Sequence, residues 1–442
     1  MSGETTQGER DARVAAYLAA AEVAAREVPG LDGVAPRALD RIAIIGGGTM
    51  GVGIAVACAE AGLPVTVIDR AEAVAGARER VQSVYTRHVK RQNLTAEALA
   101  ERLARVTVAD AWDAVGQASV VIEAAFEDMA VKIDIFRRLD QLAPAGAVLA
   151  TNTSYLDIDA IAAATSRPAD VLGLHFFAPA NIMKLLEIVR AAKTAPDVLA
   201  TGLALAARVK KQPVVAGVCD GFIGNRIFAM YRRHAEYLLE DGASPEAIDA
   251  AIEGLGFAMG PFAVSDLSGL DIAFAMRRRR DATRDPGERY VAIADRLVDA
   301  GRLGRKTGAG WYAYDAEGKR APDPVTAAIV AEERAKMGVA PRDFTVEDIQ
   351  RRILAVMANE GAKELAEGIA LRASDIDVAL VNGYAFPRAM GGPMWAADER
   401  GLAAVLDDVQ AAHRAGGVGS EPASLLVDLA ARGGRLTEWT RG

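Results

Sequence analysis

Cysteine is nearly absent from this sequence, since only Cys58 and Cys219 occur among 442 residues. The two lie far apart and neither belongs to a CxxC pair, which argues against a disulfide framework and against a cysteine-ligated metal. Such sparse cysteine is typical of a reducing compartment. We therefore expect a cytoplasmic protein without a metal site.

Long apolar runs and a surplus of basic charge are missing as well. No stretch of about 18 apolar residues without charge occurs, so no membrane span is expected. The polar residues 1–10 lack the apolar core of a signal peptide. Lysine and arginine total 51 against 59 aspartate and glutamate, a net charge of −8. This balance argues against a nucleic-acid surface but leaves room for a local basic pocket that binds one anionic ligand.

The residues that are present are those of a large globular chain. Hydrophobic residues make up 51% and charged residues 25%, and a chain of this length is expected to form about two to four domains. Apolar runs alternate with helical segments in the first half, which predicts the α/β class with a Rossmann-type, doubly wound, mostly parallel sheet. We expect strands at 41–45, 65–68, 119–124, 147–150 and 171–177.

The second half has a helical texture and contains a repeat. The motif RIFA at 226–229 returns as RILA at 352–355, and AMGP at 258–261 returns as AMGGP at 389–393. We interpret this as the duplication of a mostly helical unit of roughly 100 residues. Helices are expected at 221–241, 245–254, 290–300, 325–337 and 345–370. The expected domains are an N-terminal extension with a helix at 11–27 (1–38), a nucleotide-binding domain (39–211) and two helical domains (212–320 and 340–442).

A glycine-rich motif follows the first expected strand. Gly46, Gly48 and Gly51 fit G-x-G-x-x-G, with Thr49 and Met50 opening the next helix. This pattern places backbone amides and a helix N-terminus against a pyrophosphate. Asp69 ends the second expected strand, where a carboxylate binds ribose hydroxyls and repels a 2′-phosphate. We therefore expect NAD as cofactor. The neighbouring Arg70 weakens the preference over NADP, and a glycine-rich turn without a ligand is the alternative.

One histidine differs in context from the other three. His88, His234 and His413 lie in charged or terminal stretches and are expected at the surface. His175 lies in GLHFFAP at the end of an apolar strand, where open α/β sheets place ligands. A core histidine with all its hydrogen bonds satisfied is the alternative for His175.

An acid stands near His175 in the sequence. Glu187 lies in a second apolar run, 184–189, and if this run pairs with 171–177 the two side chains meet. A carboxylate there would fix the imidazole tautomer and raise its basicity. The alternative for Glu187 is a surface acid on an edge strand.

Two polar loops complete the set of candidates. Asn152, Thr153 and Ser154 follow an expected strand, and Asn225 stands in GFIGNR at the start of the helical half. Loops after strands carry active-site residues, but a plain turn or a helix cap explains these residues equally well.

These motifs together resemble the 3-hydroxyacyl-CoA dehydrogenase family over nearly the whole chain. The matching stretches are IGGGTMGVGIA, NTSYL, GLHFFAPANIMKLLEIV, DGFIGNR, MGPFAVSDLSGLDI and LGRKTGAGWYAYD. The later stretch NEGAKELAEGIALRASDIDVALVNGYAFPRAMGGPMWAAD is similar to the second C-terminal domain of multifunctional β-oxidation enzymes. The helix at 11–27 is similar to the linker that precedes the dehydrogenase half of those enzymes.

The resemblance implies an activity and residue roles. The activity is reversible, NAD-dependent oxidation of (3S)-3-hydroxyacyl-CoA to 3-oxoacyl-CoA in fatty-acid β-oxidation or a related acyl-CoA pathway. His175 corresponds to the catalytic base and Glu187 to its partner. Ser154 and Asn225 correspond to residues that hydrogen-bond the substrate or hold the catalytic geometry. Glu127, Lys132, Asn152 and Lys306 correspond to cofactor contacts.

The sequence departs from the family pattern at three positions. Ala178 stands where Asn or Ser is usual, Tyr155 replaces a small residue, and Arg351 of the second helical copy stands where the first copy has Asn225. Arg87 and Lys90 are candidates to bind the CoA arm, although a solvated charged face explains them at least as well.

Other functions remain open at this point. One is a dehydrogenase of a free β-hydroxy acid, and another is an NADPH-dependent 3-oxoacyl-CoA reductase. A third, from another class, is a non-catalytic structural relative that binds NAD. We expect a small-molecule acyl-CoA substrate, no nucleic-acid partner, and a monomer or homodimer. Because no hydratase domain precedes the dehydrogenase, we also expect a dehydrogenase half that works alongside an enoyl-CoA hydratase.

Overall fold

The computed structural model describes residues 6–92 and 95–441, except for the side chains at 87–92 and 96. Its contacts divide the chain into two units. The first runs to Asn225 and includes 367–384, and the second comprises 226–366 and 385–442. The domain boundaries expected from the sequence stay predictions.

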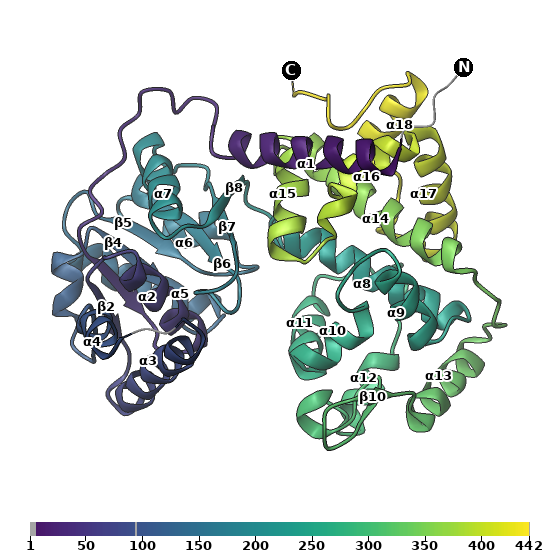
Figure 1. The fold of residues 1–442 in the computed structure, drawn as a ribbon, viewed down its shortest axis with the longest axis horizontal. Helices are drawn as coiled ribbons and strands as arrows, with labels where there is room; N and C mark the ends of the chain where they lie inside the picture. Colours follow the sequence, from purple (N-terminus) through teal and green to yellow (C-terminus); the bar gives the residue numbers. More distant parts are fainter. Residues whose placement is uncertain (1–5, 93–94, 442) are drawn as a thin grey trace. The chain divides into compact units, whose positions relative to one another are not determined.

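The first unit is built on one eight-stranded sheet (Figure 1). The strand order is β3-β2-β1-β4-β5-β6-β7-β8, and every neighbouring pair is parallel except the antiparallel pair β6–β7. The predicted fold class, a doubly wound, mostly parallel sheet followed by helices, is confirmed. The strands are β1 (Ile42–Ile45), β2 (Val65–Ile68), β3 (Val106–Ala109), β4 (Val120–Glu123), β5 (Val148–Thr151), β6 (Val171–Phe176), β7 (Leu185–Val189) and β8 (Gln212–Ala216).

Helices cover this sheet, and its central strands are mainly apolar and buried along their whole length. Every residue of β1, β4, β5 and β6 is buried, as expected where both faces of a parallel sheet are covered. The helices are α2 (Thr49–Glu60), α3 (Ala71–Gln92), α4 (Ala96–Ala104), α5 (Met129–Leu142), α6 (Ile158–Ala163) and α7 (Pro196–Arg208), with short 3-10 turns η1 (Trp112–Gln117) and η2 (Pro168–Asp170).

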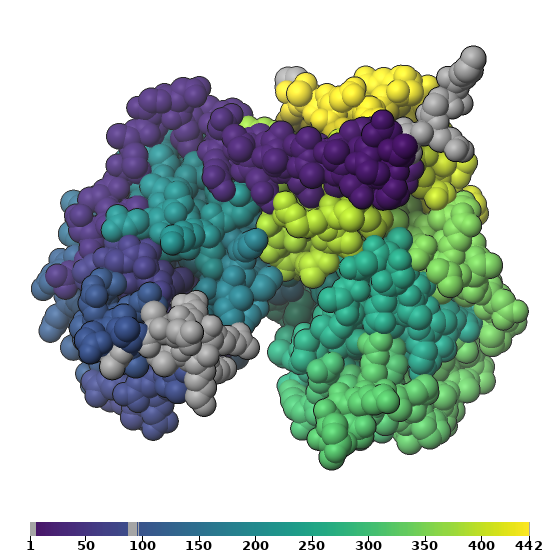
Figure 2. Space-filling view, in the orientation of Figure 1, coloured from purple at the N-terminus to yellow at the C-terminus, as the bar shows by residue number. Residues whose placement is uncertain are grey.

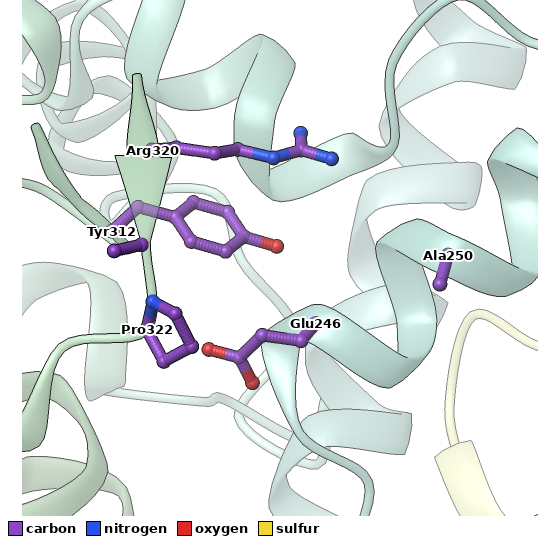
Figure 3. Close-up of a pocket in the computed structure, with 6 residues that line it drawn as sticks. Glu246, Ala250, Tyr312, Arg320 and Pro322 are labelled. Carbon is purple, nitrogen blue, oxygen red and sulfur yellow. The ribbon is translucent and has the colours of Figure 1, made fainter. Parts of the chain in front are cut away.

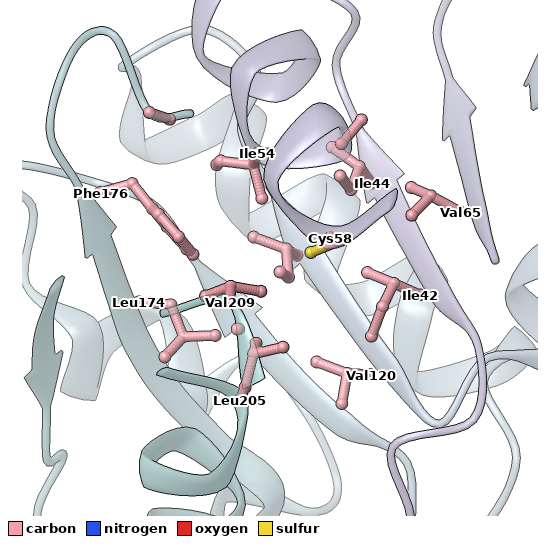
Figure 4. Packing of buried hydrophobic residues seen from close by; sticks show 14 of the residues in the cluster. Ile42, Ile44, Ile54, Cys58, Val65, Val120, Leu174, Phe176, Leu205 and Val209 are labelled. Carbon is pink, nitrogen blue, oxygen red and sulfur yellow. The ribbon is translucent and has the colours of Figure 1, made fainter. Parts of the chain in front are cut away.

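The core of this unit lies between the sheet and helices α2 and α7 (Figure 4). Ile54 and Cys58 of α2 and Leu205 of α7 join one apolar cluster with Ile42 and Leu174 of the strands. Burial raises the pKa of the Cys58 thiol to about 12. Cys58 therefore packs as a small apolar side chain, not as a reactive thiolate.

Two strands of this sheet, β3 and β8, were not expected from the sequence, and each has a local reason. In β3 only Val108 is fully buried, so the apolar signal is weak. The second residue of β8 is Pro213, which removes a backbone donor and usually argues against a strand. The sheet tolerates it because β8 ends the strand order.

The N-terminal helix α1 (Gln7–Ala24) packs on α15 (Ala373–Gly383) within the first unit. Figure 2 shows α1 in dark purple lying along the yellow-green atoms of α15. A capping box formed by Thr6 and Glu9 starts α1, and the Tyr17 hydroxyl donates to Asp377 Oδ2 at 2.6 Å. The helix expected at 11–27 is therefore present, shifted toward the N-terminus.

The second unit is mainly helical, as predicted. No helix among the described residues is long and apolar enough to cross a membrane. Its elements are α8 (Gly224–Asp241), α9 (Pro245–Glu253), α10 (Pro261–Ser268), α11 (Leu270–Arg280), α12 (Ile293–Asp299), η3 (Arg305–Thr307), β9 (Ala313–Tyr314), β10 (Arg320–Ala321), α13 (Pro324–Met337), α14 (Val346–Glu367), η4 (Arg388–Met390), α16 (Pro393–Arg400), α17 (Leu402–Gly416) and α18 (Ser424–Ala431).

Candidate active site

The glycine motif forms a tight turn between β1 and α2. Gly46 has φ +106°, and a Cβ there would lie 2.6 Å from the carbonyl oxygen of Ala124. A Cβ at Gly51 would lie 1.8 Å from the oxygen of Gly46. These two glycines are therefore required by the fold itself, because a side chain at either position would collide with backbone.

Gly48 differs, because the protein does not need a glycine there. It is exposed and a Cβ would meet nothing within 4 Å. No side chain in the described part of the chain caps the start of α2 at Thr49 and Met50, so the first amides of this helix remain available to an anion. The open backbone at Gly48 and the uncapped helix fit the pyrophosphate of a dinucleotide.

Asp69 lies beside this turn at the end of β2. Its Oδ2 accepts the N–H of Gly47 at 2.7 Å, which places the carboxylate next to the phosphate-binding turn. The side chain of the neighbouring Arg70 is 80% exposed and pairs with Glu72 at 3.1 Å. The carboxylate of Asp69 therefore lies where it would contact the adenosine ribose. The Arg70 guanidinium forms an ion pair with Glu72.

His175 and Glu187 lie directly opposite each other on the antiparallel strands β6 and β7. Opposed residues of such a pair present their side chains on the same face, and His175 Nδ1 lies 2.7 Å from Glu187 Oε2. His175 is 4% exposed and Glu187 is fully buried. The strand pairing expected from the sequence is observed, and the carboxylate does not lie on an exposed edge.

The surroundings of this pair define its chemistry. Glu187 Oε1 accepts the N–H of Gly224 at 2.9 Å, so both carboxylate oxygens have donors. With a proton on Nδ1 directed at Glu187, Nε2 of His175 is the nitrogen that can take up a proton. The rings of Phe177 and Phe222 lie 4.4 Å and 5.7 Å from the imidazole centroid. The arrangement is that of an oriented general base in a largely apolar setting.

The loop after β5 forms a hydrogen bond with β6, the strand that carries His175. Asn152 Oδ1 accepts the N–H of Phe176 at 2.9 Å. Ser154 follows, and its N–H donates to Glu127 Oε1 at 2.9 Å. Asn152 therefore has a structural contact next to His175, in addition to the cofactor contact that the resemblance implies.

Glu127 and Lys132 belong to an ionic network that is buried at Lys132 and Glu123 and exposed at Glu127. The Lys132 ammonium is 1% exposed and lies 2.8 Å from both carboxylate oxygens of Glu123 and 3.4 Å from Glu127 Oε2. The Thr151 hydroxyl also donates to Glu123. The ammonium is thus enclosed by protein carboxylates, and its contact with the cofactor stays a prediction. Glu123 was not expected, although an acid inside the apolar run 119–124 was the available signal.

Asn225 is the second residue of α8 and is half-buried. Its Oδ1 accepts the hydroxyl of Tyr384 at 2.7 Å. Tyr384 was also not expected, because it stands far along the chain with no local sign of chemistry.

For three predicted residues a place at this site stays a prediction. Lys306 belongs to the second unit, where its ammonium pairs with Asp271 at 2.5 Å. Arg87 and Lys90 fall at the end of α3, and their side chains lie outside the described part. Their roles stay predictions.

The expected surface position of His234 is wrong. His234 is fully buried and its Nε2 lies 3.0 Å from the Ser420 hydroxyl. Burial, and then the positive charge of Arg352, lower the pKa of His234 well below its usual value. His234 is therefore neutral, and the charged sequence around it was misleading because only one face of α8 is exposed. His413 is half-buried, and the side chain of His88 lies outside the described part.

A pocket of about 250 Å³ lies in the second unit, and none of the predicted site residues is among those that line it (Figure 3). Two of its polar groups already have partners, since Arg320 pairs with Glu253 at 2.6 Å and the Tyr312 hydroxyl donates to Asp249 at 2.8 Å. The lining residues are Glu246, Ala250, Tyr312, Arg320, Ala321 and Pro322. We assign it no role in the chemistry.

A dinucleotide-binding turn, an acid at the end of the second strand and a buried histidine–glutamate pair define an NAD-dependent dehydrogenase of the Rossmann class. Residues 41–219 match the NAD binding domain of 3-hydroxyacyl-CoA dehydrogenase, and residues 221–314 match the C-terminal domain of that enzyme. The chain belongs to the 3-hydroxyacyl-CoA dehydrogenase family. The predicted family, function class, enzyme class and NAD cofactor are confirmed.

Named relatives of the chain agree with this family assignment. The chain is 40% identical to the peroxisomal bifunctional enzyme of Danio rerio over 414 residues, which are 90% of this chain and 57% of that enzyme. A solved 3-hydroxybutyryl-CoA dehydrogenase from Escherichia coli has a TM-score of 0.77 at 30% identity, covering 90% of this chain and 99% of its own. The dehydrogenase part of multifunctional enzyme 1 from C. elegans has a TM-score of 0.64 at 26% identity, covering 88% and 89%.

The expected cytoplasmic location is contradicted by these comparisons. Curated relatives from animals and plants are named peroxisomal or glyoxysomal enzymes. The expectation depended on sparse cysteine. Sparse cysteine shows only that the fold needs no disulfide, and it does not distinguish one reducing compartment from another.

Proposed function

We propose that this chain oxidises (3S)-3-hydroxyacyl-CoA to 3-oxoacyl-CoA with NAD, reversibly, within fatty-acid β-oxidation or a related acyl-CoA pathway. The observation that carries the proposal is the buried contact of 2.7 Å between His175 and Glu187. The relatives support it through their names, since they are a 3-hydroxybutyryl-CoA dehydrogenase and bifunctional or multifunctional enzymes of fatty-acid β-oxidation.

The proposed reaction needs one proton acceptor and one hydride acceptor. His175 Nε2 takes the proton of the 3-hydroxyl group, and Glu187 stabilises the imidazolium that forms. When bound, NAD supplies the acceptor for the hydride that leaves C3. In the reverse direction His175 returns the proton to the oxygen. The rings of Phe177 and Phe222 limit the access of water to the imidazole.

Other side chains hold the reactants. Ser154 and Asn225 are the proposed hydrogen-bond partners of the acyl substrate, and Arg87 and Lys90 are weaker candidates for its CoA arm. The proposed cofactor contacts are Gly46, Gly48, Thr49, Met50, Gly51, Asp69, Glu127, Lys132, Asn152 and Lys306.

The activity is tested by NADH absorbance with 3-hydroxyacyl-CoA thioesters of four to sixteen carbons, with NAD and with NADP. We expect turnover with NAD, and a loss of about 10²–10⁴-fold in kcat for His175→Ala, the usual contribution of a general base. His413→Ala removes a histidine elsewhere and should leave the rate unchanged. A His175→Ala variant with the rate of the parent chain would overturn the mechanism.

The substrate class is tested by comparing 3-hydroxybutyryl-CoA with free 3-hydroxybutyrate. We expect turnover of the thioester only. A preference for the free acid would make the chain a dehydrogenase of hydroxy acids, and a preference for NADPH would make it a 3-oxoacyl-CoA reductase. NAD binding without turnover of any of these compounds would support a structural role.

We further propose a monomer or homodimer that acts alongside an enoyl-CoA hydratase. The support is that curated relatives are named bifunctional or multifunctional enzymes, so that a second activity accompanies the dehydrogenase in them. Sedimentation that shows an obligate larger assembly would contradict the proposed state.

A further inference from the structure

Tyr384 directly follows the last residue of α15, as its C-cap. The packing of α15 on the sheet determines where Tyr384 lies. Helix α15 contacts both β7 and β8 in the first unit. The approach is close, since a Cβ at Gly383 would lie 2.4 Å from Cδ2 of Leu185, the first residue of β7. The same strand carries Glu187. Tyr384 is thus anchored against the strand that holds the acid of the candidate site.

The hydroxyl and the ring of Tyr384 have separate contacts. The hydroxyl donates to Asn225 Oδ1 at 2.7 Å. The ring lies 5.4 Å from that of Phe177, in an edge-to-face arrangement at 78°. A Cβ at Gly224 would lie 2.1 Å from the ring. Only glycine at 224 is compatible with this contact, so the start of α8 and Tyr384 fit each other closely.

Phe177 and Gly224, which the Tyr384 ring contacts, each contact one member of the His175–Glu187 pair. The Phe177 ring lies 4.4 Å from that of His175, tilted by 52°, and Gly224 donates its N–H to Glu187. Phe222 and Ala385 lie close in sequence to Gly224 and Tyr384, and both have left-handed backbone, with φ +50° and +53°. Such conformations are costly for residues other than glycine, and they persist where the surrounding structure holds them.

We propose that Tyr384 is a positioning residue for the dehydrogenase reaction, in which its hydroxyl orients the amide of Asn225 and its ring holds Phe177 and Gly224 against the His175–Glu187 pair. The inference deepens the proposed function and rests on it. Because the O–H of Tyr384 engages Oδ1, the Nδ2 group of Asn225 is the part of the amide left to donate to an oxygen. The acyl thioester and the 3-oxo product both present such an oxygen.

The test is the Tyr384→Phe variant of the full chain, which keeps the ring and removes only the hydroxyl. We expect kcat/KM for the acyl-CoA to fall about tenfold, the effect of losing one orienting hydrogen bond. The KM for NAD and the pH profile of kcat should not change. Tyr17→Phe is the matched control, because it removes a tyrosine hydroxyl that bonds to α15 at Asp377. This control should have the activity of the parent chain.

A double-mutant cycle separates positioning from a general effect on folding. In the Asn225→Ala background, Tyr384→Phe should cause no further loss, because the group that the hydroxyl orients is gone. Tyr384→Leu, which also removes the ring, should be slower than Tyr384→Phe and should lower kcat.

The outcomes are distinguishable. An active parent chain with an unchanged Tyr384→Phe, or with losses that add in the cycle, overturns the inference alone. Equal losses in Tyr384→Phe and Tyr17→Phe overturn it as well, because they indicate a structural effect of α15. A parent chain that neither turns over 3-hydroxyacyl-CoA nor binds acetoacetyl-CoA overturns the proposed function and this inference together.

Discussion

The two copies of the helical repeat share their structural contacts. In α8, Arg226 is followed eight residues later by His234, and in α14, Arg352 is followed eight residues later by Glu360. Each arginine contacts the residue that stands at this eighth position on the other helix. Arg226 pairs with Glu360 at 2.7 Å, and Nε of Arg352 lies 3.4 Å from Nδ1 of His234. This reciprocal pattern is what a duplicated helix pair produces.

A buried aspartate is repeated in the same way. Asp266 in α10 accepts the N–H groups of Trp311 and Tyr312 at 2.8 and 3.0 Å. Asp398 in α16 accepts those of Leu436 and Thr437 at 2.7 and 2.9 Å. Three residues after each aspartate a glycine starts the next helix, with φ +98° at Gly269 and +89° at Gly401. The groups that hold the repeat together are thus present in both copies.

The copies differ at the positions that touch the candidate site. The first has Asn225, bonded to Tyr384, where the second has Arg351, which pairs with Asp408 at 2.7 Å. The second copy, however, contributes Tyr384 itself. The comparison teaches that the packing residues of the two copies are equivalent, while their residues at the site differ and complement each other.

The largest expected effect comes from removing the buried aspartate that the two copies share, and it tests whether the copies are structurally equivalent. Asp266→Ala leaves two buried backbone amides and the hydroxyl of Tyr314 without their acceptor, so the free energy of unfolding should fall by about 3–5 kcal/mol. The free energy of unfolding should fall by a similar amount in Asp398→Ala. Both are measured by urea unfolding. The control is Asp407→Ala at an exposed position, and an Asp398→Ala variant as stable as this control would mean that the two copies are not equivalent.

A smaller effect sharpens the difference between the site residues. Asn225→Ala should lower kcat/KM for a 3-hydroxyacyl-CoA about 30-fold, because one oriented donor is lost. Arg351→Ala should leave kcat/KM unchanged, since it removes an ion pair of a side chain that is 39% exposed. Steady-state kinetics of the two variants decide, and similar losses in both would show that Arg351 also serves the reaction.

The smallest effect concerns His234, which stands where the second copy has Glu360. Burial lowers its pKa in the folded chain, so below pH about 6.5 the unfolded chain binds a proton that the folded chain does not. Stability should therefore fall as the pH drops below this value, by up to about 1.4 kcal/mol per pH unit from this one group. His234→Gln should remove that part of the pH dependence, as measured by urea unfolding at several pH values. His413→Gln should leave it in place, and an unchanged slope in His234→Gln would contradict the assignment.

Much of the fold and part of the site could be read from the sequence, because the relevant signals are local. Continuous apolar runs predicted the buried strands, and the spacing of three glycines with Asp69 predicted the dinucleotide turn. His175 and Glu187 could be paired in advance because a short loop joins their strands, so that the register followed from the two apolar runs. Each of these inferences needs only neighbours in the chain.

Only the tertiary structure decided the rest. The bond between Tyr384 and Asn225 joins residues 159 positions apart, and no periodicity predicts which distant helix end reaches a given side chain. The burial of His234 and the enclosure of Lys132 by Glu123 likewise depend on segments that fold against them. The sequence by itself determined most strands of the large sheet, the glycine turn and the candidate for the base. Packing determined which polar groups are buried and what they touch, because burial is a property of the assembled chain and not of any one segment.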